Sequence, residues 1–201
     1  MAVRLFFVGV TLLLCWGPAR AAEQGQLDGS PALFTVLAAI NTVGYDAEID
    51  SPSNNPLRGA VRSELAARDI PCRAELERFF REHRQKDWTA ELSQYVSFAL
   101  VVDGPPSFQY RLKQNELPPD VTELDGLRPL MARFYREAAI DALWQKAQPA
   151  LDAAIARYQL PVVQAVTQAS GYLRTPTGGD LGWRFQIYVD LLGAPNQIQM
   201  R

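Results

Sequence analysis

The sequence predicts a mainly α-helical fold: a multi-helix orthogonal bundle that closes with a short C-terminal β-strand or hairpin and is truncated there. Three observations predict it. Apolar residues recur with helical spacing from Leu33 to Leu173. Serine, proline and glycine mark the ends of these stretches. Beyond them the apolar spacing changes to two residues, from Trp183 to Val189, which is typical of a strand.

The first 21 residues have the pattern of a secretory signal peptide. Arg4 provides the positive charge, and the apolar stretch Leu5–Trp16 follows. Gly17-Pro18 interrupts this stretch, and Ala19-Arg20-Ala21 provides small residues for signal peptidase. We therefore expect an exported protein, periplasmic or extracellular, whose mature chain begins at Ala22.

Two other interpretations of this segment are open. An uncleaved membrane anchor would need about 20 apolar residues, and Leu5–Trp16 is much shorter. A lipoprotein would carry its lipid on Cys15, but Leu14 is larger than the residue normally found before a lipidated cysteine. No later stretch is long enough to span a membrane. After cleavage we thus expect no stable membrane insertion.

Composition is that of an ordinary globular domain, with 48% hydrophobic and 21% charged residues. The whole chain has 20 basic and 22 acidic residues, and loss of Arg4 and Arg20 with the signal leaves 18 against 22, a net of −4. Such a balance argues against nucleic-acid binding. Cys72 would be the only cysteine of the mature chain, so an intrachain disulfide is excluded.

We divide the mature chain into a helical domain over residues 22–182 and an incomplete β element over 183–201. The helical domain is expected to contain seven helices, which begin near Ser30, Pro56, Pro71, Trp88, Leu127, Ile140 and Pro161. Gly44 provides a C-cap for the first. Pro149 should kink or restart the sixth helix, and Pro161 should open the seventh. The long Pro/Gly-rich loop over 104–119 carries a short element at most.

The C-terminal strand, Trp183–Leu192, has no convincing partner in the sequence. The weak candidates are Ser107–Leu112 in the long loop and a returning hairpin arm at Gln197–Arg201. Because a lone strand leaves its backbone groups unsatisfied, we expect Trp183–Leu192 to dock against missing C-terminal structure or against another chain.

Cys72 and His83 are the two side chains that most invite a catalytic interpretation, and neither has the right context. A thiolate at a helix start is favoured by the helix dipole, but a nucleophile also needs a base within hydrogen-bonding reach. Eleven residues of helix separate Cys72 from His83, about 16 Å. His83 is the only histidine, which excludes a zinc site with two or three histidines. We expect Cys72 to be an inert, small hydrophobic residue and His83 to be a structural, partly exposed histidine.

Other motifs are incomplete. Asp46, Glu48 and Asp50 alternate like calcium-loop ligands, but the glycine and the final glutamate of such a loop are missing. Thr177–Asp180 lacks the lysine of a phosphate loop and precedes a strand instead of a helix. The sequence therefore assigns no catalytic, cofactor-binding or metal-binding residue, and no cofactor.

Two regions resemble the N-terminal half of a group of uncharacterised secreted bacterial proteins. The first comprises Ala32–Asn41 (ALFTVLAAIN), Gly44-Tyr45-Asp46 and Asp50-Ser51-Pro52; the second comprises Arg184–Tyr188 (RFQIY) and Asp190–Gln197 (DLLGAPNQ). Members of that group are longer and continue into strands and a histidine-containing helix that resembles a metallopeptidase helix. The resemblance implies a front portion of a larger peptidase-like protein and maps no catalytic residue onto this chain, which ends before that helix.

Three functions remain open on this basis. The first is a non-catalytic helical scaffold or the N-terminal portion of a peptidase-like protein. The second is a secreted hydrolase that uses carboxylates in an interhelical groove. The third is a binding module for an apolar or peptide ligand, and the aromatic candidates for its groove are Phe79, Phe80, Trp88, Tyr95 and Trp144. Helical spacing favours a plain core role for these aromatic residues.

Overall fold

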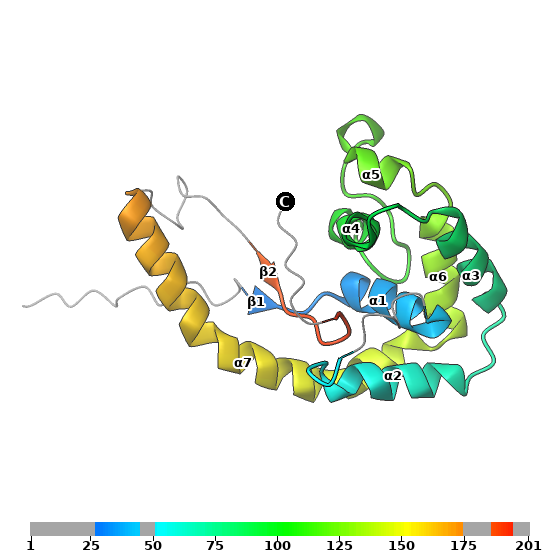
Figure 1. Ribbon diagram of the computed structural model, residues 1–201, viewed down its shortest axis with the longest axis horizontal. Helices are drawn as coiled ribbons and strands as arrows, with labels where there is room; N and C mark the ends of the chain where they lie inside the picture. The colour runs from blue at the N-terminus through cyan, green and yellow to red at the C-terminus, as the bar shows by residue number, and fades with distance from the viewer. Residues whose placement is uncertain (1–26, 45–50, 175–185, 195–201) are drawn as a thin grey trace, which may run out of the picture.

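The computed structural model describes residues 27–44, 51–174 and 186–194, and confirms the mainly helical fold (Figure 1). A head of packed helices lies at one side, and one long helix leads away from it. The elements in chain order are β1 (Leu27–Asp28), α1 (Pro31–Val43), α2 (Pro56–Ala66), α3 (Arg73–Glu82), α4 (Trp88–Val101), the 3-10 turn η2 (Gln114–Glu116), α5 (Pro119–Thr122), α6 (Leu127–Glu137), α7 (Ile140–Leu173) and β2 (Ile187–Tyr188).

Helix α1 forms the centre of the head. Every residue from Ala32 to Asn41 is buried, and α2, α3, α4, α6 and α7 all pack against this helix. A helix that is apolar on all sides is stable only when it is covered on all sides. Its ends are as expected: the Ser30 side chain accepts a hydrogen bond from the Leu33 N–H, and Gly44 takes the left-handed conformation at φ 65°. The predicted boundaries of α1 are therefore confirmed.

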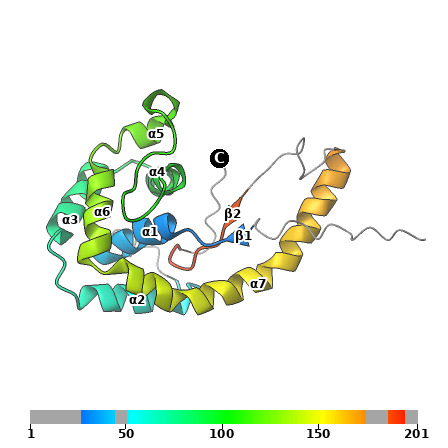
Figure 2. The ribbon, with the colours of Figure 1, turned by 180° about the vertical axis from the view of Figure 1, so that it is seen from behind.

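Helix α7 corrects the expectation of two separate helices. It runs unbroken from Ile140 to Leu173 with Pro149 and Pro161 inside it, and at 1.5 Å per residue it is about 51 Å long. Both prolines are exposed. A proline ring removes one backbone hydrogen bond, and on an exposed face water can satisfy the carbonyl that loses its partner. Figure 2 shows α7 as a bent, continuous helix.

The C-terminal strand has a partner that the sequence analysis missed. β2 pairs in parallel with β1, with Leu27 opposite Ile187 and Asp28 opposite Tyr188, and the Val189 N–H donates to the Asp28 carbonyl at 2.9 Å. The expectation that this strand lacks a partner within the chain was therefore wrong. The first candidate partner, Ser107–Leu112, pairs elsewhere: its residue Tyr110 forms an isolated antiparallel bridge with Val102. Gln197–Arg201 lies outside the described residues.

β1 ends at Asp28, two residues before Ser30, the cap of α1, so the helix limits the strand on that side. Residues 1–26, on its other side, lie outside the described part. The paired part of the predicted strand is Ile187–Tyr188, and residues 183–185 lie outside the described part. Within the described residues, none of the helices is long and apolar enough to cross a membrane.

Candidate functional site

Cys72 is a structural residue in the head. It is fully buried, and its backbone N–H donates to the Glu137 carboxylate at 2.7 Å. Burial, together with the neighbouring Glu137, raises the pKa of the Cys72 thiol to about 12. A thiol with that pKa is protonated at neutral pH and is a poor nucleophile. The burial of Cys72 agrees with the expected role of a small hydrophobic residue, and its inertness stays a prediction.

His83 lies at the end of α3, stacked on Phe79 with 3.9 Å between the ring centroids. Its Nδ1 is 2.8 Å from the Phe79 carbonyl oxygen. Within the described residues, no three histidine, cysteine, aspartate or glutamate side chains lie together as a metal site would require. Asp46, Glu48, Asp50 and Thr177–Asp180 lie outside the described residues.

The aromatic residues considered for a ligand groove pack instead in the head. Phe80 packs edge-on against Phe79 and Tyr95, with ring centroids 6.2 and 5.0 Å apart. Trp144 packs edge-on against Phe34 of α1 at 5.2 Å. The small apolar cavity beside Trp144 has a volume of about 10 Å³, about the space of one water molecule. The Trp88 side chain lies outside the described part of the structure.

A buried polar cluster fastens the C-terminal segment to the head. Arg58 of α2 is 1% exposed and donates to the Leu192 carbonyl. The Asn41 side chain donates to the same oxygen at 3.4 Å, and Arg62 donates to Asn41 at 2.8 Å. Asp190 accepts hydrogen bonds from the backbone N–H groups of Leu192 and Gly193. Burial raises the pKa of Asp190, and these bonds together with the Arg58 charge partly offset that rise.

This cluster borders an open cavity of about 370 Å³ at the N-terminus of α2. Its lining is polar: Ser51, Asn54, Asn55, Pro56, Arg58, Gly59 and Arg62. The guanidinium group of Arg58, in the first turn of α2, and that of Arg62, one turn further along, favour negative charge. Arg58 and Arg62 already bind the C-terminal segment and α1, so their first role is to hold the head together.

The second half of α7, residues 155–173, is not explained by packing within the head. We call this half the arm. The arm leads away from the head (Figure 1). Tyr158, Leu160 and Tyr172 are 46%, 64% and 88% exposed. Arg157 is the arm's one charged residue, and its guanidinium lies 5.3 Å from the Tyr158 ring centroid. A long helical surface with a single charge and exposed aromatic rings is typical of a surface that binds a partner.

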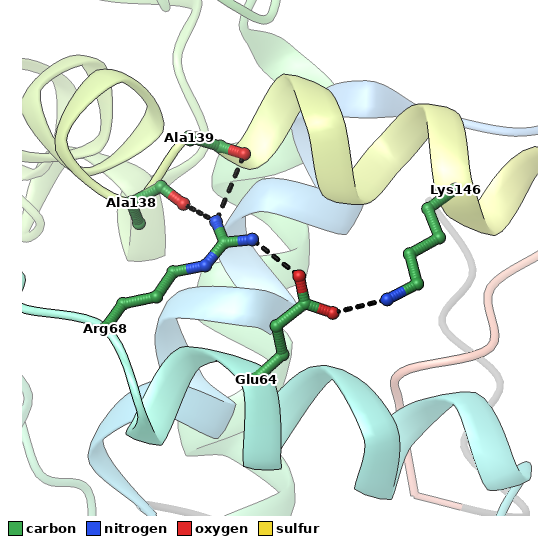
Figure 3. A network of polar contacts seen from close by, with 5 residues as sticks. All are labelled: Glu64, Arg68, Ala138, Ala139 and Lys146. Atoms are coloured by element: carbon green, nitrogen blue, oxygen red, sulfur yellow. Dashed lines mark hydrogen bonds and ion pairs between the residues drawn. The ribbon is translucent and has the colours of Figure 1, made fainter.

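The base of the arm's helix is held to the head by the polar network in Figure 3. Arg68, which follows the C-terminus of α2, donates to the carbonyls of Ala138 and Ala139 between α6 and α7, and to the Glu64 carboxylate at 2.7 Å. Lys146 of α7 donates to the other Glu64 oxygen at 2.7 Å. Ala139 has a left-handed conformation with φ 47°. The network therefore stabilises the turn that sets the direction of α7.

Removing Arg68 should cost more stability than removing Lys146. We expect Arg68→Ala to lower the free energy of unfolding by about 1–2 kcal/mol, because it leaves the two carbonyls and Glu64 without this donor. Lys146 is 71% exposed, so Lys146→Ala should change the free energy of unfolding by less than about 0.5 kcal/mol. Urea unfolding of both variants measures this difference, and equal effects would contradict the assigned role of Arg68.

The same network should make stability depend on pH. The hydrogen bond from Lys146, helped by Arg68, lowers the pKa of Glu64 below its ordinary 4.5. A carboxylate with a lowered pKa contributes stability above its unfolded pKa and loses that contribution as the pH falls through its folded pKa. The destabilisation by Arg68→Ala should therefore shrink as the pH falls below 4.5. Glu64→Gln is the control, since it removes this part of the pH dependence.

Sequence reasoning missed Arg58 as a core residue, although a signal was present. Arg58, Val61 and Leu65 are the buried residues of α2, and their spacing of three and four places them on one helical face. A single arginine on an otherwise apolar face indicates a buried polar partner elsewhere in the chain.

Comparisons with known protein families, with curated proteins and with solved structures found no match to this chain.

Proposed function

We propose that this chain is an exported, non-catalytic helical scaffold whose arm docks another polypeptide. The observation that carries the proposal is the arm itself: about half of a 34-residue helix extends from the head with exposed apolar side chains. Full burial of an exposed leucine such as Leu160 would contribute roughly 1.5–3 kcal/mol before the entropic costs of association. A polypeptide partner fits best because the arm offers an extended surface and not an enclosed pocket.

The head supplies the stable base that such a scaffold needs. Phe34 and Trp144 pack α7 against α1, and the Glu64–Arg68–Lys146 network holds α7 to α2. Because the N-terminal half of α7 is fixed in this way, the arm is presented in a defined direction. A rigid helix loses little conformational entropy on binding, which favours affinity.

The two alternative functions have less support. Four glutamates of the head already form ion pairs: Glu64 with Arg68 and Lys146, Glu75 and Glu137 with Arg133, and Glu91 with Arg84. An apolar ligand would need far more space than the cavity beside Trp144 offers.

Site-specific photo-crosslinking tests the proposal. A photoreactive phenylalanine analogue is placed at Tyr158 or Tyr172 of the arm, and at Leu112 of the head as the matched control; Leu112 is 40% exposed. In cells that export the full chain, we expect defined crosslinked products from both arm positions and none from Leu112. Equal crosslinking at all three positions, or none at the arm, would contradict the proposal.

A further inference from the structure

We propose that the polypeptide docked by the arm is a second copy of this chain, paired arm to arm in antiparallel orientation. This inference rests on the proposed function and names the partner for the same surface. Three observations carry it: the spacing of the arm's apolar residues, the lack of charge around them, and the alternation of large and small side chains.

The spacing is that of a helix-pairing seam. Its members are Ile155, Tyr158, Val162, Ala165, Ala169 and Tyr172, separated alternately by three and four residues. A mean period of 3.5 residues keeps one stripe facing a partner helix along its whole length. The stripe continues the face that α7 buries against the head, where Ala147 and Leu151 are 2% and 5% exposed. In the arm, Ala165, Ala169 and both tyrosines are exposed.

The charge pattern permits pairing with an identical arm. Positions that flank such a seam commonly carry charges that select the partner. Here the flanking residues are uncharged: Gln159, Pro161, Val166 and Gln168. A two-fold pair brings the same surface together with itself, and this surface meets its copy without like-charge repulsion.

Side-chain size selects the antiparallel orientation. With the two-fold axis between Val163 and Gln164, Ile155 faces Tyr172, Tyr158 faces Ala169, and Val162 faces Ala165 of the other copy. Large residues then oppose small ones in the two inner layers, which gives even packing. A parallel pair in register would place Ala165 against Ala165, which leaves a void, and Tyr158 against Tyr158, which crowds the layer. The antiparallel pair also puts the two heads at opposite ends.

The contact is short, so the association should be weak enough to titrate. The arm has 19 residues from Ile155 to Leu173, about 28 Å of helix. That length gives an interface at the small end of the range for specific complexes, and we expect dissociation in the micromolar range.

Sedimentation velocity on the purified mature chain, from about 1 to 200 µM, tests the association across the range expected for it. We expect a shift from the mass of one chain to that of two. Val162→Glu should weaken the dimer by about 100-fold or more, because it buries a carboxylate in the seam. Thr167→Glu is the matched control: it adds the same charge about 140° around the helix and should leave dimerisation unchanged. A single-chain mass at all concentrations would overturn the inference.

Cysteine crosslinking tests the orientation. When Val162→Cys chains are mixed with Ala165→Cys chains and oxidised, we expect the mixed disulfide between the two variants to dominate. Cys72 is buried and its thiol pKa is about 12, so it should not compete. Dominant Ala165→Cys homodimers would show a parallel pair and overturn the antiparallel arrangement.

The outcome also separates this inference from the proposed function. Crosslinks from Tyr158 and Tyr172 to a product of twice the chain's mass support both. Crosslinks to a product of another mass, with a monomeric purified chain, overturn the second-copy inference and leave the docking function standing. Absence of crosslinks at the arm overturns both.

Discussion

Replacement of Arg58 by alanine is expected to lower the free energy of unfolding by about 3–5 kcal/mol. Arg58 is 1% exposed and its guanidinium donates to the Leu192 carbonyl. The substitution leaves a cavity, removes this donor, and takes away the positive charge that partly offsets the burial of Asp190. The segment from Gln186 to Ala194 should then separate from the head more readily.

Two measurements check this result. Denaturant unfolding gives the change in stability, and hydrogen exchange at the Val189 and Leu192 amides should accelerate more than exchange in α3. Arg81→Ala is the matched control, because Arg81 is exposed on α3, and it should change stability by less than about 0.5 kcal/mol. If Arg58→Ala behaved like Arg81→Ala, the buried cluster would not hold the C-terminal segment.

Phe80→Ala should have a similarly large effect, a loss of about 3–5 kcal/mol. Phe80 is 1% exposed and lies edge-on to the rings of Phe79 and Tyr95. The truncation removes apolar contacts and leaves a cavity that rigid neighbouring helices fill only in part. Tyr172→Ala, at a position that is 88% exposed, should be nearly neutral for the stability of the monomer.

Thermal and urea unfolding of both variants at low protein concentration measure these changes. This pair also separates the two interpretations of the aromatic residues. A near-neutral Phe80→Ala would indicate that Phe80 lines an open ligand surface, whereas the expected loss would establish it as core. Tyr172→Ala should instead show its effect on the association of the arm.

Local sequence predicted the helices that end in a clear capping signal. Ser30-Pro31 and Gly44 bound α1 as expected, and Pro56 opens α2 with Asn55 as its cap. Such signals act within one turn of helix, since they satisfy the free N–H and carbonyl groups at its ends. Pro71 was less informative: α3 begins at Arg73 with Cys72 as its cap.

Proline alone could not decide the course of α7. Pro149 and Pro161 have the same local preference whether they begin a helix or lie inside one. Their exposed positions on a single long helix depend on which face α7 packs against α1, and that packing is a property of the whole head. The exposure of the arm could not be predicted for the same reason, because the same apolar spacing occurs in a buried helix and in an exposed one.

The residues by themselves decided the helical class and the capped ends of α1 and α2, since these follow from spacing and from groups a few positions apart. The tertiary structure alone decided that Ile187–Tyr188 pairs with Leu27–Asp28, that Arg58 binds the Leu192 carbonyl, and that half of α7 leaves the head. These contacts join residues more than 100 positions apart or depend on which face is covered, and no local preference specifies either.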